Sequence, residues 1–104
     1  MKIFLDTAVF EDIEKANQTG LIDGVTTNPS LILKSGGDPV ETIKKISGEF
    51  PFFESISAEV VADEALEMVE QAQAFKNLEN VTIKVPLTVE GLKACKMLTS
   101  DGFT

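Results

Sequence analysis

The stretch Val81-Thr82-Ile83-Lys84-Val85-Pro86-Leu87 places a lysine in the middle of a short apolar segment. Side chains alternate between the two faces of a strand, so the valines, Ile83 and Leu87 share one face. Thr82, Lys84 and Pro86 share the other. A charged amine on so apolar a strand costs free energy unless that face has a use. The stretch therefore predicts a buried strand with a functional lysine, or an edge strand whose lysine reaches water.

The composition is that of one small domain, and the charge argues against two classes of binding partner. The chain has 104 residues, of which 43% are hydrophobic and 25% are charged, which suits a modest core. A net charge of −8 argues against binding to nucleic acid or to an anionic membrane surface. The absence of histidine removes Ser-His and Cys-His nucleophile pairs and the usual zinc sites. The single cysteine, Cys95, and the lack of a signal peptide or a membrane-spanning run predict a cytoplasmic protein.

Strand and helix patterns alternate four times along the chain, which predicts an α/β fold with a parallel sheet and crossover helices. The expected strands are Met1–Leu5, Gly24–Thr27, a strand within Phe52–Val61, and Val81–Leu87. The expected helices cover Phe10–Asn17, a turn at Leu31–Leu33, and three segments that begin after Asp38, at Asp63 and after Thr88. No glycine-rich phosphate fingerprint follows any strand, so a dinucleotide-binding fold lacks its signal.

Three of the expected helices carry an apolar stripe that should face the core. The stripe residues are Val40, Ile43, Ile46 and Phe50 in the helix after Asp38, Ala65, Leu66, Val69, Ala72 and Phe75 in the helix that begins at Asp63, and Leu92, Cys95 (or Met97) and Leu98 in the helix after Thr88.

Polar side chains lie at or near the carboxyl ends of all four expected strands. These are Asp6, Asn28, Glu59 and Lys84. In a parallel barrel one strand face meets the helices, and the carboxyl end of the other face is where active sites are built. Because side chains alternate between the two faces of a strand, the positions of Asp6, Glu59 and Lys84 within their strands are consistent with one shared inner face. The alternative interpretation is a buried ion pair between Lys84 and Asp6 or Glu59.

An amine flanked by two carboxylates permits a narrow chemistry. Desolvation inside a barrel favours the neutral amine, whereas nearby carboxylates favour the ammonium. A neutral lysine amine attacks a ketone and forms a Schiff base, which withdraws electrons and lets an adjacent carbon–carbon bond break. One carboxylate would take the hydroxyl proton of the leaving fragment, and the other would move protons during imine formation. No metal is expected, because the lysine occupies the space and no third carboxylate follows a strand.

Four motifs resemble those of the transaldolase family, and in particular its short-chain branch, which also contains fructose-6-phosphate aldolase. They are Phe4-Leu5-Asp6-Thr7-Ala8, Gly24-Val25-Thr26-Thr27-Asn28-Pro29-Ser30, Ile83-Lys84-Val85-Pro86 and Thr88-Val89-Glu90-Gly91-Leu92. They occur in the family's order, and the resemblance extends over the whole chain.

The resemblance implies a role for five residues. Lys84 matches the Schiff-base lysine, and Asp6 matches the carboxylate that moves the proton of the cleaved hydroxyl. Asn28 matches the asparagine that hydrogen-bonds the donor sugar, and Thr27 is its neighbour in the same signature. Glu59 matches a position that is Glu in transaldolases and Gln in fructose-6-phosphate aldolases, which favours a transaldolase.

The same resemblance implies an activity and its substrates. The expected reaction is cofactor-free transfer of a dihydroxyacetone unit between sugar phosphates of the pentose phosphate pathway, by a homo-oligomeric enzyme. Its substrates would be fructose 6-phosphate, sedoheptulose 7-phosphate, erythrose 4-phosphate and glyceraldehyde 3-phosphate.

The chain departs from the family in its length. A (β/α)₈ TIM barrel needs about 200 residues or more, whereas this sequence has four β/α units and no arginine. The arginine and serine with which the family holds the sugar phosphate have no counterpart here. We therefore expect residues 1–104 to form the N-terminal half of a barrel, with no second domain, as a fragment or a half-barrel needing a partner. Two alternative functions stay open: a fructose-6-phosphate aldolase-type lyase, and a non-catalytic half-barrel that persists by self-association.

Overall fold

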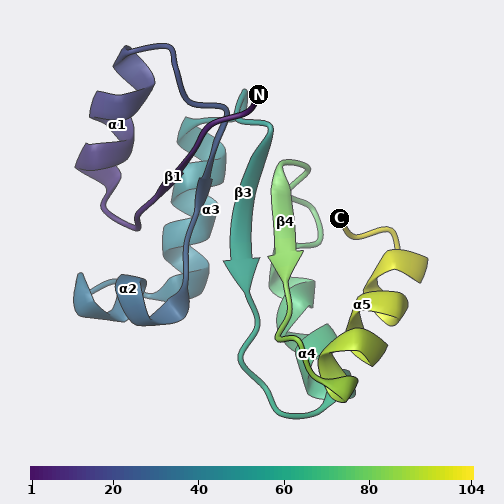
Figure 1. Ribbon diagram of the computed structural model, residues 1–104. Coiled ribbons are helices and arrows are strands. Elements are labelled where there is room, and N and C mark those ends of the chain that lie inside the picture. The colour runs from purple at the N-terminus through teal and green to yellow at the C-terminus, as the bar shows by residue number, and fades with distance from the viewer.

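Four short strands form one parallel sheet in the order β1-β2-β3-β4. A computed structural model describes all of residues 1–104 (Figure 1). The strands are β1 (Phe4–Asp6), β2 (Gly24–Thr26), β3 (Ser55–Glu59) and β4 (Val81–Lys84). Each strand is followed by at least one helix, so the predicted α/β fold is confirmed, and it is that of the first four β/α units of a TIM barrel.

The helices are α1 (Phe10–Gln18), α2 (Pro29–Lys34), α3 (Pro39–Glu49), α4 (Ala65–Ala72), the 3₁₀ turn η1 (Gln73–Phe75) and α5 (Val89–Ser100). Three of them, α2, α3 and α5, begin after a residue whose side chain caps the first turn. The Asp38 side chain accepts the Glu41 N–H at 3.0 Å, and Thr88 Oγ1 accepts the Gly91 N–H at 3.0 Å, so both predicted caps are confirmed. None of the helices combines the length and apolar character needed to cross a membrane.

The predicted start of α4 at Asp63 is wrong. The residue before the helix is Glu64, whose side chain makes no capping bond. Instead, the Ala65 N–H donates to the Glu90 carboxylate of α5 at 3.2 Å. A free helix N–H needs an acceptor, and here the acceptor comes from a neighbouring helix that no local pattern reveals.

The core lies between the sheet and the helices. Val25, Ile56 and Ala58 are each about 1% exposed or less and belong to the same cluster as Ile43 and Ile46 of α3. The opposite face of the sheet has no helix over it, and there the Phe4 side chain is 43% exposed. The alternation read from the sequence therefore assigned both faces of the sheet correctly.

Three strands are shorter than predicted, and β2 is so by one residue, because it ends at Thr26 rather than Thr27. β1 begins at Phe4 rather than Met1, and the Ile3 N–H donates to the Asp23 side chain instead of a backbone carbonyl. β4 ends at Lys84, because Pro86 has no N–H to donate and Leu87 is 91% exposed. The lysine consequently ends its strand instead of lying in its middle.

The predicted apolar stripes of α4 and α5 are partly wrong. Leu66 is 71% exposed and Leu92 is 58% exposed, and Cys95 is also exposed. The buried residues between the two helices are Ala65, Met68, Ala72, Gly91, Ala94 and Leu98. Most of these side chains are small, so the two helices approach each other closely and the bulkier leucines turn outward.

Candidate active site

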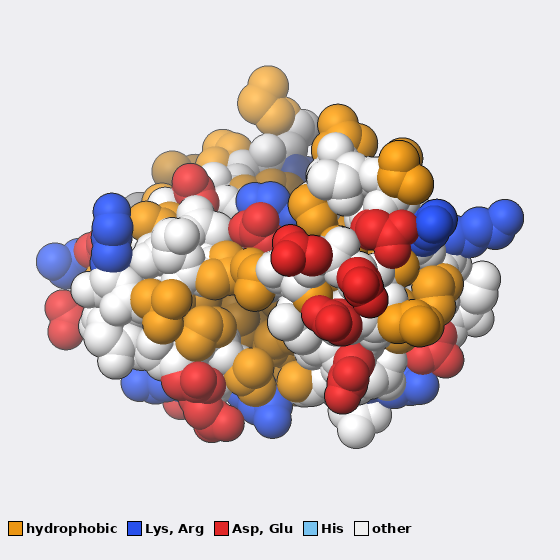
Figure 2. Space-filling model, turned by 90° about the horizontal axis from the view of Figure 1, so that it is seen from below, with side chains coloured by type: hydrophobic (Ala, Val, Ile, Leu, Met, Phe, Trp, Pro, Cys, Tyr) orange, Lys and Arg blue, Asp and Glu red, His pale blue; other side chains and the backbone are white.

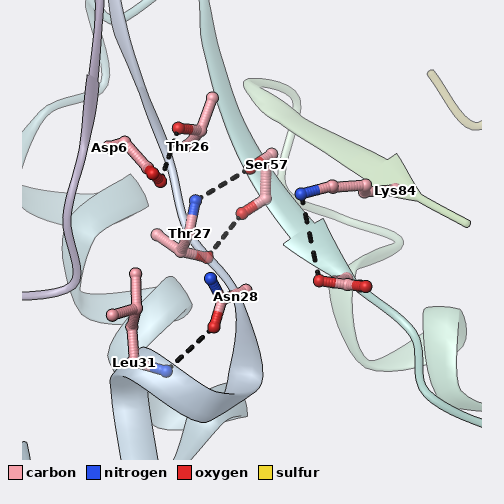
Figure 3. Close-up of polar contacts among 8 residues, drawn as sticks. Asp6, Thr26, Thr27, Asn28, Leu31, Ser57 and Lys84 are labelled. Atoms are coloured by element: carbon pink, nitrogen blue, oxygen red, sulfur yellow. Dashed lines mark hydrogen bonds and ion pairs between the residues drawn. The ribbon is translucent and has the colours of Figure 1, made fainter.

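Lys84 and Glu59 are direct neighbours at the carboxyl ends of β4 and β3. The Lys84 Nζ lies 3.9 Å from the Glu59 Oε2 on the uncovered face of the sheet (Figure 3). Their side chains are 52% and 28% exposed, so this is not the buried ion pair of the alternative interpretation. An ion pair this long and this exposed contributes at most about 1 kcal/mol. It therefore leaves the amine free to move toward a ligand.

The desolvation expected around Lys84 is absent from this chain. A barrel interior would surround the amine with low-dielectric protein, but here the inner face of the sheet is open. The Lys84 amine therefore lies beside the Glu59 carboxylate on a face that is open to water.

Asp6 ends β1 on the same face of the sheet and is held there by Thr26. The two residues are paired in the β1–β2 register, and the Thr26 Oγ1 donates to Asp6 Oδ1 at 2.9 Å (Figure 3). This bond orients the carboxylate through one oxygen and leaves the other available to a ligand. Thr26 is absent from the predicted site, because its place beside Asp6 depends on the register between β1 and β2.

Thr27 holds the end of β2 against β3. Its side chain is 1% exposed, its N–H donates to Ser57 Oγ at 2.9 Å, and its Oγ1 donates to the Ser57 carbonyl at 2.8 Å. The regular β2–β3 pairing ends at Val25 and Ile56, so these two bonds continue the connection beyond the ladder. The expected contact of Thr27 with substrate stays a prediction, since both polar groups already have partners within the chain.

Asn28 is the residue before α2 and uses only its amide oxygen to cap that helix. Its Oδ1 accepts the Leu31 N–H at 2.9 Å, which caps the helix, and Pro29 follows at the first helical position. The amide nitrogen lies on the opposite side of the group from Leu31 (Figure 3). The Asn28 amide nitrogen therefore stays available as a hydrogen-bond donor, and its expected contact with the donor sugar stays a prediction.

The structure places Asp6, Asn28, Glu59 and Lys84 at the same end of the sheet. Only Lys84 and Glu59 contact each other, and Asp6 is bonded to Thr26 instead of the amine. Ser57, which is absent from the predicted site, bonds twice to Thr27 and connects β3 to the end of β2.

This end of the molecule is rich in carboxylates. Acidic side chains gather beside apolar ones around a hollow (Figure 2), and one hollow is lined by Glu59, Val61, Pro86 and Glu90, among others. The pKa of the Glu90 carboxyl lies below its ordinary value, chiefly because Lys93 donates a hydrogen bond and also because the Ala65 N–H does. Glu90 is therefore engaged in structural contacts and is a poor proton acceptor.

We expect Ser57→Ala to release the Thr27 backbone from β3. The substitution removes the acceptor of an N–H in a residue that is 1% exposed, which costs about 1–3 kcal/mol. Urea unfolding measures the loss, and hydrogen exchange should show reduced protection of the Thr27 amide. Ser55→Ala is the matched control, because its hydroxyl bonds to Thr82 Oγ1 instead. Equal protection of the Thr27 amide in both variants would contradict this role.

Comparison with known proteins agrees with the resemblance. The family described as Transaldolase/Fructose-6-phosphate aldolase matches residues 3–104. A "Probable transaldolase" of Sinorhizobium medicae (strain WSM419) is 54% identical over 105 residues, covering 98% of this chain and 46% of the relative. A "Probable transaldolase" of Brucella ovis is 50% identical over 103 residues, with the same coverage. The chain therefore spans less than half the length of these curated relatives.

Proposed function

Because the chain belongs to the transaldolase/fructose-6-phosphate aldolase family, we propose that it carries the Schiff-base half of a transaldolase active site. The observation that supports this most is the Lys84 amine beside the Glu59 carboxylate, at the strand ends that also present Asp6. The proposed substrates are sugar phosphates, and the proposed setting is the pentose phosphate pathway of the cytoplasm. Residues 1–104 would form one half-barrel domain.

Lys84 begins the proposed reaction. Its neutral amine attacks the ketone carbon of fructose 6-phosphate, and the resulting carbinolamine loses water to give an iminium. Glu59 is the nearest carboxylate, with its Oε2 3.9 Å from Nζ, so it would move protons to and from that water.

Asp6 takes part in breaking the carbon–carbon bond. Its free oxygen accepts the hydroxyl proton of the leaving fragment while the bond electrons move into the iminium, releasing glyceraldehyde 3-phosphate and leaving a three-carbon enamine. The enamine then adds to the aldehyde of erythrose 4-phosphate, and hydrolysis of the new iminium gives sedoheptulose 7-phosphate. Thr26 orients Asp6 throughout, and the Asn28 amide would donate to a hydroxyl of the bound sugar.

The test uses a completed barrel, meaning residues 1–104 joined to the rest of the Sinorhizobium medicae relative. Borohydride reduces an iminium to a stable amine, so fructose 6-phosphate should add a three-carbon mass to the protein. Intact mass spectrometry reads this directly. A completed barrel that folds but gains no mass would contradict the proposal.

Glu59→Gln should change the ratio of two reactions in the completed barrel. An amide cannot ionise, so it cannot relay protons to the imine water as a carboxylate does. We expect dihydroxyacetone transfer to erythrose 4-phosphate to fall by about 100-fold, which is within the range of one general acid–base group, while direct cleavage of fructose 6-phosphate falls less. Coupled assays of both activities give the ratio.

The matched control for this ratio is Glu54→Gln. Glu54 lies just before β3, at the opposite end from the site, and pairs with Lys2. It should leave the ratio of transfer to cleavage unchanged. The same ratio in Glu59→Gln and in the unsubstituted barrel would count against the role of Glu59, and would favour the aldolase-type alternative.

A second candidate function is a non-catalytic half-barrel. It is favoured by the open inner face of the sheet, where Phe4 is 43% exposed, and by coverage of only 46% of the relatives. The absence of arginine and a net charge of −8 also oppose tight binding of an anionic sugar phosphate. We expect the isolated chain to show no transaldolase turnover, because distant phosphate contacts normally help to position the reacting carbon. A stable monomer with measurable turnover would overturn that expectation.

A further inference from the structure

Polar side chains of the uncovered sheet face lie level with one another across all four strands. Asp6 pairs with Thr26 in the β1–β2 register, and Ser57 pairs with Thr82 in the β3–β4 register. The β2–β3 register, extended by one residue beyond its last pair, brings Thr26 level with Ser57. Alternate residues of a strand share a face, so these four residues form one polar row on the face that carries Lys84.

A sugar bound in the proposed reaction must lie above the middle of this polar row. Lys84 ends β4, and its amine extends to Glu59 on β3 (Figure 3). Asp6 ends β1 and is bonded to Thr26 on β2. The ketone carbon that the amine attacks and the carbon whose hydroxyl gives its proton to Asp6 are separated by a single carbon atom. The reacting part of the sugar therefore spans the gap between β3 and β2.

Ser57 presents a hydroxyl group at this gap. Its Oγ accepts the Thr27 N–H at 2.9 Å, which holds the oxygen toward the end of β2. No group of the chain accepts the Ser57 hydroxyl proton, and the side chain is only half-buried. A serine hydroxyl can donate one hydrogen bond as well as accept, so Ser57 keeps a donor for a ligand.

The other hydroxyls of the polar row are engaged or lie outside the gap. The Thr26 Oγ1 donates its proton to Asp6 at 2.9 Å. Thr82 lies on β4, and its Oγ1 bonds to the Ser55 Oγ at 2.6 Å, away from the Lys84 end of the strand. Ser57 is therefore the residue of the row whose hydroxyl is free to donate to a ligand between the amine and Asp6.

We propose that Ser57 is a further substrate-binding residue, which donates its hydroxyl proton to the sugar hydroxyl beside the attacked ketone. In fructose 6-phosphate, Lys84 attacks carbon 2 and Asp6 takes the proton of the 4-hydroxyl, so the group between them is the 3-hydroxyl. The inference rests on the proposed function and deepens it, because it makes Ser57 a determinant of substrate choice. Ketoses that carry a hydroxyl on carbon 3 are preferred to those that lack it.

The test is a competition in the completed barrel between fructose 6-phosphate and its 3-deoxy analogue, which lacks only the hydroxyl assigned to Ser57. Both ketoses can form an iminium at Lys84, and borohydride fixes each one as a stable adduct. The two adducts differ in mass by one oxygen atom, so one intact-mass spectrum gives the ratio in which the ketoses react. The unsubstituted barrel should favour fructose 6-phosphate.

Ser57→Ala should reduce this preference about three- to tenfold, which is the usual effect of one lost hydrogen bond. The loosening of Thr27 that the same substitution causes acts on both ketoses alike, so it does not change their ratio. Ser57→Cys is a second variant that keeps the shape of the side chain but replaces the hydroxyl with a weak donor. It should reduce the preference as well, and it carries the test where the alanine variant does not fold.

Ser55→Ala is the matched control. Its hydroxyl lies on the same face of β3 and bonds to Thr82 instead of facing the gap, so its loss should leave the preference for fructose 6-phosphate unchanged. A preference that is reduced in the Ser57 variants and kept in Ser55→Ala supports the inference.

The remaining outcomes separate a failure of this inference from a failure of the proposed function. An unsubstituted barrel that forms adducts without preference, or Ser57 variants that keep the full preference, would overturn the inference and leave Ser57 with its structural bonds to Thr27 alone. An equal reduction in Ser55→Ala would overturn it too, since general loosening of β3 would then be the cause. An unsubstituted barrel that forms no adduct with either ketose contradicts the proposed function itself, and with it this inference.

Discussion

Lys84→Met in the completed barrel is expected to abolish borohydride trapping with fructose 6-phosphate. Methionine is similar to lysine in length and lacks the amine, so no iminium can form at this position. The barrel should still fold, because the Lys84 side chain is 52% exposed and its one ion pair is long. Intact mass spectrometry after reduction should show the unmodified mass alone.

Lys93→Met is the control for this result. Lys93 lies on α5 instead of a strand, and its amine pairs with Glu90 at 3.0 Å, so its loss should leave trapping unchanged. Peptide mapping of the trapped protein locates the adduct. An adduct that persists in Lys84→Met, or that maps to Lys34 or Lys93, would show that the nucleophile has been assigned to the wrong lysine.

Gly91→Ala is expected to destabilise the chain more than any surface substitution. A Cβ at Gly91 would lie 1.8 Å from the Pro86 carbonyl oxygen and 2.9 Å from its carbon. These are backbone atoms that a rotamer change cannot move, so α5 or the β4–α5 connection must shift. We expect a loss of about 3 kcal/mol, at the upper end of the usual cost of overpacking. Urea unfolding measures it.

Gly48→Ala provides the opposite control. Gly48 lies within α3, and a Cβ there would meet nothing within 4 Å. Alanine in an open helical position should stabilise the chain by about 0.5–1 kcal/mol. If both glycine substitutions changed the free energy of unfolding equally, close packing at Gly91 would not be the cause. The Gly91 contact also matters to the site, because the connection that it packs against follows Lys84 directly.

The faces of the strands could be predicted from the sequence because alternation is a local property. Successive residues of a strand point to opposite faces of the sheet. Leu5, Ile56 and Ile83 accordingly pack against the core. Asp6 and Glu59 lie on the opposite face. Parallel strands joined by helices bring their carboxyl ends to one edge, so the position of Lys84 beside Glu59 follows from the same pattern.

The packing of the helices could not be predicted in the same way. Hydropathy selected Leu66 and Leu92 for the core, whereas the structure buries Met68 and Ala94. The reason is that close approach of two helices depends on small residues meeting across the interface, and a single helix's sequence does not show what it will meet. The acceptor for the first N–H of α4 is likewise on α5.

The sequence by itself determined the alternation of strands and helices, the parallel sheet, and which polar residues share the carboxyl ends of the strands. These three features depend on the periodicity of apolar residues within each segment and on the short connections between successive segments. Only the tertiary structure decided which side chains orient the site, since Thr26 reaches Asp6, and Ser57 reaches Thr27, across different strands. It also decided that the Lys84 amine is half-exposed, because the enclosure of a side chain depends on every element around it, and here one face of the sheet is open.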